Sequence, residues 1–126
     1  MHRRIDIAGH VYIALTLLFT VYGQLVLKWQ MSHVGPLPDG TLRKLQFLLL
    51  QFLNPWIMTG LASAFLASLA WMAAMTRLDL NYAYPFMSLA FVIVMAFSVL
   101  FLHEALSLQR IMGTFLVVTG LVIMAR

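Results

Sequence analysis

A single uncharged stretch, from Ala83 to Leu102, constrains this chain more than any other feature of its sequence. A helix of about 20 apolar residues, rising about 1.5 Å per residue, covers the roughly 30 Å hydrocarbon core of a bilayer. Polar residues flank the stretch at Asn81 and at His103-Glu104. It therefore predicts a membrane-spanning helix, and we interpret the other segments as its partners.

The composition supports lipid as the solvent of the whole chain. Of 126 residues, 63% are hydrophobic and only 10% are charged. A soluble domain of this size needs a charged exterior, whereas long segments here lack any polar face. The sequence therefore predicts an all-α integral membrane protein. The absence of cysteine excludes disulfides, thiolate metal sites and cysteine nucleophiles.

Four segments are long and apolar enough to cross a bilayer. They predict one four-helix transmembrane domain over residues 1–126, with short loops and helices at about 8–29, 55–75, 82–102 and 110–125. Asn54 and Pro55 are typical of an N-cap and a first helical position, so the second helix is expected to begin there. Residues 41–53 are strongly apolar but too short to span. They predict either an interfacial helix or an extension of the second helix.

The first predicted helix carries polar residues at every fourth position. Because four residues advance a helix by about 400°, neighbours in this row share a face while the row winds slowly round the helix. A polar row in lipid is costly, so we expect it to face other helices or a water-filled cavity. Its members are Tyr12, Thr16, Thr20, Gln24 and Lys28.

Small residues recur on the second and fourth predicted helices, and such residues let membrane helices approach closely. In segment 55–75 they lie three or four residues apart, and Gly113 and Gly120 share one side of the last helix. This glycine pair predicts a dimer seam. The connection around Arg77 and Asp79 is very short, so the second and third helices are expected to be antiparallel neighbours.

The basic residues are spread singly or in pairs rather than gathered on one face. The formal net charge is +4, but this distribution fits membrane flanks and argues against nucleic-acid binding. It also gives no orientation, because the two sides of the predicted helices carry equal numbers of basic residues. A chain that inserts both ways and pairs antiparallel is therefore compatible with the sequence. One side carries Arg3, Arg4, Arg77 and Arg126, and the other carries Lys28, Arg43, Lys44 and Arg110.

Several motifs together resemble a known family. They are YGQLVLK at 22–28, YAYPFMSLAFV at 82–92, the His103-Glu104 pair and the Gly113/Gly120 pair. These residues resemble the small multidrug resistance branch of the drug/metabolite transporter superfamily. More closely, they resemble ArnE/ArnF-type subunits, which flip undecaprenyl-phosphate-linked aminoarabinose across the bacterial inner membrane. The resemblance covers the first helix and the second half of the chain, while residues 32–54 have no counterpart in it.

This resemblance implies a multi-pass transporter of the bacterial inner membrane, active as a homodimer or as a heterodimer with a similar subunit. The implied substrate is a polyprenyl-phosphate-linked sugar in contact with membrane lipid. Drug exporters of the family resemble one another in a membrane-embedded glutamate on the first helix, and Thr20 occupies that position here. Without the carboxylate, the resemblance favours a lipid-phosphate flippase over a proton-coupled drug pump.

Lys28 and Glu104 are the charged residues that we expect at a binding site. Lys28 follows Thr20 and Gln24 along the polar row, and its ammonium suits a lipid phosphate; alternatively, it only snorkels to the interface. Glu104 suits an amino sugar or a proton-responsive role, or it anchors the end of the third helix. A lone pair of His103 and Glu104 makes neither a metal site nor a catalytic dyad.

Three further residues, at the start of the third helix, suit carbohydrate. Tyr82, Tyr84 and Ser88 offer hydroxyls and aromatic faces, and they predict a sugar-binding vestibule. Tyrosines also form belts at the membrane interface in many membrane proteins. The sequence leaves both interpretations open.

No pattern indicates covalent chemistry. The sequence has no phosphate-cradling glycine loop, no acid pair and no nucleophile beside a base, so we expect a transporter without a cofactor rather than an enzyme. The leading hypothesis is the flipping of a polyprenyl-phosphate-linked sugar or a related lipid phosphate. Two alternatives remain open. One is a small multidrug or cation exporter in which Glu104 replaces the missing acid, and the other is a non-transporting partner subunit of a glycolipid pathway.

Overall fold

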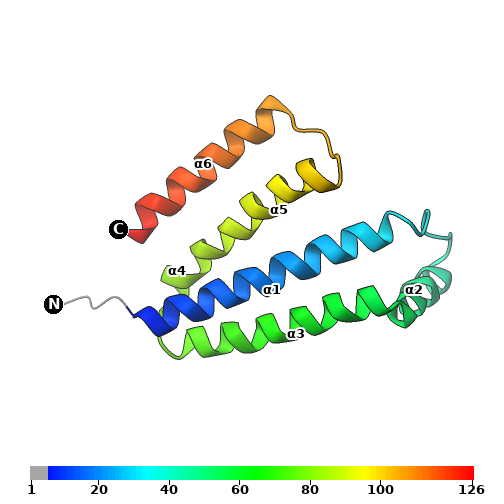
Figure 1. Ribbon diagram of the computed structural model, residues 1–126, viewed down its shortest axis with the longest axis horizontal. Helices are drawn as coiled ribbons and strands as arrows, with labels where there is room; N and C mark the ends of the chain where they lie inside the picture. Colours follow the sequence, from blue (N-terminus) through cyan, green and yellow to red (C-terminus); the bar gives the residue numbers. More distant parts are fainter. Residues whose placement is uncertain (1–5) are drawn as a thin grey trace.

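The computed structural model describes residues 6–126 as a chain of helices (Figure 1). Arg3 and Arg4, two of the basic residues compared between the two sides of the predicted helices, lie outside the described residues. The elements in chain order are α1 (Ile7–Met31), α2 (Thr41–Leu50), the 3-10 turn η1 (Gln51–Leu53), α3 (Pro55–Met75), α4 (Leu80–Ala83), the 3-10 turn η2 (Tyr84–Met87), α5 (Ser88–Phe101) and α6 (Leu108–Ala125).

Within residues 6–126, four helical segments are long and apolar enough to cross a membrane: Ile7–Met31, Pro55–Met75, Leu80–Phe101 and Leu108–Ala125. This confirms the predicted all-α, four-span membrane fold. The third span is a composite of α4, η2 and α5. It tightens into a 3-10 turn around Pro85, because proline has no amide hydrogen to donate to the preceding turn.

Local capping sets where the first two spans begin. The side chain of Asp6 accepts a hydrogen bond from the Gly9 amide at 3.0 Å and starts α1. Asn54 does the same for α3, accepting from the Trp56 amide at 2.9 Å, with Pro55 at the first helical position. Both caps satisfy amides that the first turn leaves without a partner.

Residues 41–53 form a helix of their own rather than an extension of α3. Asn54 has an extended backbone, with φ −77° and ψ 121°, which breaks the helix between η1 and α3. Figure 1 shows α2 nearly end-on, turned across the direction of α1 and α3. The extension alternative is therefore wrong, and an interfacial position for α2 stays a prediction.

The helices α1 and α3 form a closely packed pair. At their crossing, a Cβ atom added to Gly23 would lie 3.1 Å from the carbonyl oxygen of Gly60. The hydroxyl of Ser63 donates a hydrogen bond across the pair to the carbonyl of Phe19 at 2.6 Å. Small side chains permit this approach; the buried face of α3 comprises Ile57, Gly60, Ser63, Ala67, Ala70 and Ala74.

The helices α5 and α6 form a second hairpin that leans away from the first pair (Figure 1). The short connection after α3 brings α4 beside it, but α5 then packs against α1 instead. The expectation that the second and third spans are neighbours therefore holds where α3 meets α4 but not for α5. In the most apolar window of each span, 33% of residues are buried for α1 and for α3, but only 6% for α4–α5 and for α6.

The two glycines of the predicted dimer seam lie on this open hairpin. A Cβ atom added to Gly113 or Gly120 would meet no described atom within 4 Å. Nothing within residues 6–126 therefore accounts for the two glycines, and their role in a dimer stays a prediction.

Candidate functional site

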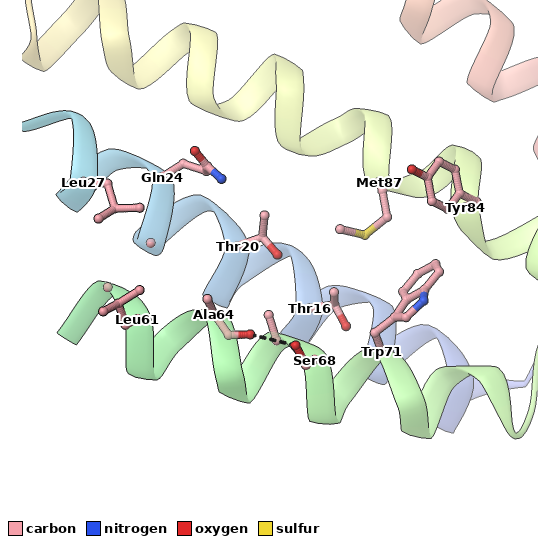
Figure 2. Close-up of a pocket in the computed structure, with 13 residues that line it drawn as sticks. Thr16, Thr20, Gln24, Leu27, Leu61, Ala64, Ser68, Trp71, Tyr84 and Met87 are labelled. Carbon is pink, nitrogen blue, oxygen red and sulfur yellow. Dashed lines mark hydrogen bonds between the residues drawn. The ribbon is translucent and has the colours of Figure 1, made fainter. Parts of the chain in front are cut away.

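A cavity of about 370 Å3 lies between α1, α3 and η2. Figure 2 shows side chains of all three elements directed into it. Its large apolar lining residues are Leu27, Leu61 and Met87. Its polar and aromatic lining consists of Thr16, Thr20, Gln24, Ser68, Trp71 and Tyr84.

Of the three polar side chains that α1 contributes to the cavity, two are available to a ligand. The hydroxyl of Thr16 donates to the carbonyl of Tyr12 at 2.8 Å, one turn earlier in its own helix. In contrast, the Thr20 hydroxyl and the Gln24 amide have no hydrogen-bond partner among residues 6–126, and both border the cavity. Thr20 is partly buried and Gln24 is exposed, so both side chains are free to hydrogen-bond a polar ligand.

The end of the cavity nearest η2 is aromatic. The rings of Trp71 and Tyr84 meet edge to face, with centroids 6.1 Å apart and an interplanar angle of 78°. Beside them, the hydroxyl of Ser68 is taken up by a hydrogen bond to the Ala64 carbonyl at 3.1 Å (Figure 2). Trp71 was not predicted as a lining residue, because a tryptophan inside a predicted span has no local sign that it borders a cavity.

Lys28, near the end of α1, and Glu104, just after α5, form an ion pair. The Lys28 ammonium lies 3.7 Å from a carboxylate oxygen of Glu104, and the two side chains are 60% and 38% exposed. Neither residue lines the central cavity, but Lys28 lies one turn beyond Gln24 on α1. The two charged residues that the sequence singled out are therefore direct partners, which their separation in the chain did not reveal.

The backbone after α5 turns sharply to bring Glu104 into this position. His103 has a positive φ of 57°, a conformation that few non-glycine residues adopt and in which histidine is enriched. The turn lets the Glu104 amide donate back to the Ser98 carbonyl at 3.1 Å. The His-Glu motif thus has a local structural role beside any role in binding.

Tyr82 and Ser88 do not border the central cavity, and their part in a sugar-binding vestibule stays a prediction. Tyr82 pairs through its hydroxyl with the Nε2 atom of His10 at 2.9 Å. The hydroxyl of Ser88 donates to the Pro85 carbonyl at 2.6 Å, three residues earlier in the chain. His10 was not singled out from the sequence, and its position just inside the N-terminal cap of α1 was the only local signal for it.

The winding of the polar row explains which of its members reach the cavity. Thr16, Thr20 and Gln24 are consecutive members and border it together. Each step of four residues turns the row by about 40°, so its ends face elsewhere. Tyr12 packs against the buried cluster that includes Ile13.

The described part of the chain contains no group of three His, Cys, Asp or Glu side chains arranged to hold a metal ion. The chemistry of the cavity is therefore that of hydroxyl, amide and aromatic groups, with a lysine–glutamate pair close to one end. Such groups bind and orient a polar molecule by hydrogen bonds and ring contacts.

Residues 7–126 match the EamA-like transporter family. The chain is 33% identical over 119 residues to the probable 4-amino-4-deoxy-L-arabinose-phosphoundecaprenol flippase subunit ArnF of Sodalis glossinidius, covering 91% of this chain and 88% of that protein. It is 29% identical over 108 residues to the corresponding probable subunit ArnE of Aeromonas hydrophila, covering 86% and 89%.

No solved structure matches the chain. The match to the family spans nearly the whole sequence, and the similarity to ArnE and ArnF subunits agrees with the resemblance seen in the motifs of the first and third spans. Together with the four apolar helices among residues 6–126, these matches establish a multi-pass membrane protein. The chain belongs to the EamA-like transporter family.

Proposed function

We propose that this protein is one subunit of a flippase that carries a polyprenyl-phosphate-linked amino sugar across the bacterial inner membrane. The observation that carries the proposal is the central cavity, where Thr20 and Gln24 have no protein partner and the row continues to the Lys28–Glu104 pair. The names of the related ArnE and ArnF proteins, which specify an aminoarabinose-phosphoundecaprenol, support the choice of substrate.

The cavity has the groups that a sugar headgroup needs. Sugar hydroxyls both donate and accept hydrogen bonds, which suits the Thr20 hydroxyl and the Gln24 amide. The aromatic faces of Trp71 and Tyr84 suit the apolar faces of a sugar ring. The polyprenyl chain needs no polar groups and remains in the lipid while the headgroup crosses.

The Lys28–Glu104 pair matches the two charges of an amino-sugar phosphate. The phosphate is attracted to the Lys28 ammonium, and the sugar ammonium is attracted to the Glu104 carboxylate. The pair is long, at 3.7 Å, and substantially exposed, so opening it costs about 1 kcal/mol or less. The headgroup then replaces one weak ion pair by two charge contacts.

The subunit is proposed to work in a dimer with a second, similar chain. The open faces of α5 and α6 and the uncovered Gly113 and Gly120 offer a surface for that partner. The names of two different related subunits, ArnE and ArnF, favour a heterodimer. Rocking of one subunit against the other then exposes the cavity alternately to the two sides of the membrane.

Export of cationic drugs fits the cavity less well. A cation held inside a membrane needs a nearby carboxylate, and no described residue that lines the central cavity is Asp or Glu. Glu104 lies outside the cavity and is already paired with Lys28.

The proposal is tested by flipping in reconstituted vesicles. The protein, alone and co-expressed with a similar subunit, is given a fluorescent short-chain polyprenyl phosphoaminoarabinose. We expect Thr20→Val and Lys28→Ala to slow flipping at least about ten-fold, because each removes one charged or hydrogen-bonding contact to the headgroup.

Two matched variants control for folding. Thr119→Val makes the same change on α6, where the hydroxyl bonds only its own helix, to Phe115 at 2.8 Å, and Lys44→Ala removes an exposed lysine of α2. Both should flip at the wild-type rate. Equal rates for Thr20→Val and Thr119→Val would contradict the cavity route. Proton-driven drug efflux that Glu104→Gln abolishes would support the exporter instead, and flipping by the partner alone would support a non-transporting role.

A further inference from the structure

A second polar cavity lies at the opposite end of the molecule from Lys28 and Glu104. Its volume is about 900 Å3, and it opens where α1 begins, α3 turns into α4 and α6 ends. Figure 1 shows this end of the bundle, where α1 begins and α6 ends, opposite the end that carries α2 and the α5–α6 connection. The polar lining consists of Asp6, His10, Arg77, Asp79, Asn81, Tyr82 and Arg126.

A hydrogen-bonded network fixes one wall of this terminal cavity. A carbonyl oxygen only accepts, so the Nδ1 atom of His10 carries the hydrogen and donates to the Asp6 carbonyl at 2.6 Å. The Nε2 atom then meets the Tyr82 hydroxyl at 2.9 Å. The ring of Phe86 also packs edge-on against His10, at 5.9 Å between centroids. The imidazole is thus held at both nitrogens and ties α1 to α4.

The charged groups of the terminal cavity are of both signs. Arg77 lies 3.5 Å from Asp6, whose carboxylate also caps α1. Asp79 and Arg126 line the same cavity, and Asp79 makes no side-chain cap to α4. A simple anion would be repelled by the two carboxylates, and a simple cation by the two arginines. A ligand that carries a phosphate and an ammonium satisfies both.

The two ends of α1 are separated by one bilayer thickness. His10 and Lys28 are 18 residues apart, which at about 1.5 Å per residue gives about 27 Å. This distance is close to the roughly 30 Å hydrocarbon core. The terminal cavity and the Lys28–Glu104 pair therefore lie at opposite faces of the membrane, with the central cavity between them.

We infer that the terminal cavity binds a zwitterionic phosphate–amine headgroup at the membrane face opposite Lys28. Arg77 and Arg126 hold the phosphate, and Asp79 holds the ammonium. Asp6 remains the N-cap of α1 and positions Arg77. The inference rests on the proposed function insofar as this headgroup is the transported amino sugar. An ethanolamine phospholipid of the surrounding membrane has the same chemistry, and the experiment separates these two sources.

The test counts headgroups bound to the purified full-length protein by native mass spectrometry. Three probes are compared: short-chain polyprenyl phosphoaminoarabinose, its N-acetylated counterpart, which lacks the ammonium, and a short-chain phosphatidylethanolamine. We expect two amino-sugar lipids per wild-type chain, one at each face. Asp79→Asn and Lys28→Ala should each reduce the number to one, and the double variant should bind none.

Asp79→Asn is the primary variant because no fold contact of that side chain is lost. Arg77→Gln removes the phosphate partner as well as the Asp6 contact, and Arg77→Lys should restore part of the affinity. Asp39→Asn, in the exposed loop before α2, is the matched control and should bind two lipids. In Lys28→Ala, where only the terminal cavity is expected to bind, N-acetylation of the lipid should weaken binding at least ten-fold.

The outcomes separate this inference from the proposed function. One lipid per wild-type chain, lost in Lys28→Ala, would overturn the terminal site while leaving the flippase intact. Equal binding of the N-acetylated lipid to Lys28→Ala would overturn the role of Asp79. Preferential binding of phosphatidylethanolamine to Lys28→Ala would keep the zwitterion site but assign it to bulk lipid. Absent flipping with two lipids bound would instead contradict the proposed function.

Discussion

The two helix pairs of this protein use small residues in opposite ways. In α1 and α3, glycine and serine lie at an occupied contact, where Gly23 approaches the Gly60 carbonyl and Ser63 bonds Phe19. On α6 of the second pair, by contrast, neither Gly113 nor Gly120 has a described atom within 4 Å of an added Cβ. The first pair is thus a completed scaffold beside the central cavity, and the second pair presents faces that a partner can cover.

The largest expected effect comes from filling the occupied contact. Gly23→Val should destabilise the protein by about 1–3 kcal/mol, because its Cβ would lie 3.1 Å from the Gly60 carbonyl and force the helices apart. Gly113→Val makes the same change on α6 and should leave the stability of the isolated chain nearly unchanged. Thermal unfolding in detergent compares the two. Equal losses would contradict the difference between the pairs.

The same glycine on α6 has a separate readout in assembly. If Gly113 and Gly120 form a dimer seam, as predicted from the sequence, Gly113→Val should lower the fraction of cross-linked dimer while leaving the thermal midpoint of the monomer in place. Gly23→Val should instead lower the thermal midpoint more than it lowers the fraction of cross-linked dimer. An unchanged cross-linked fraction for Gly113→Val would remove the glycine pair from the interface.

A smaller effect is expected from the polar contacts of the two pairs. Ser63→Ala removes a hydrogen bond of 2.6 Å between α1 and α3 and should cost about 0.6–1.7 kcal/mol. Thr114→Val is the counterpart at the α5–α6 contact. Its hydroxyl bonds its own helix at Arg110 and reaches α5 only through the sulfur of Met95 at 3.3 Å, a weak acceptor. Chemical denaturation should rank Ser63→Ala as the more damaging change.

The smallest effect concerns the ion pair that joins the two halves. A double-mutant cycle on Lys28→Ala and Glu104→Ala should give a coupling of about 1 kcal/mol or less, because the pair is 3.7 Å long and exposed. The coupling should fall further at high salt. A coupling of several kcal/mol would mean that this contact holds the second pair against the first, and would contradict the view of α5–α6 as loosely attached.

The predictable part of this molecule was the part that is local in sequence. Apolar length located the spans, and Asn54-Pro55 marked the start of α3. The four-residue spacing also grouped Thr16, Thr20 and Gln24 on one face. The unpredicted part consists of tertiary contacts. The Lys28–Glu104 pair and the His10–Tyr82 bond each join distant segments. The packing of α5 on α1 was missed because a short loop constrains only the first turn after it.

The most direct test of the substrate path uses the absence of cysteine from the chain. Thr20→Cys introduces a single thiol in the central cavity, and Thr119→Cys introduces one on the exposed face of α6. A small water-soluble thiol reagent should label Thr20→Cys, and the polyprenyl phosphoaminoarabinose should protect it, while labelling of Thr119→Cys should not respond to that lipid. Labelling of Thr20→Cys that the lipid leaves unchanged would contradict passage of the headgroup through this cavity.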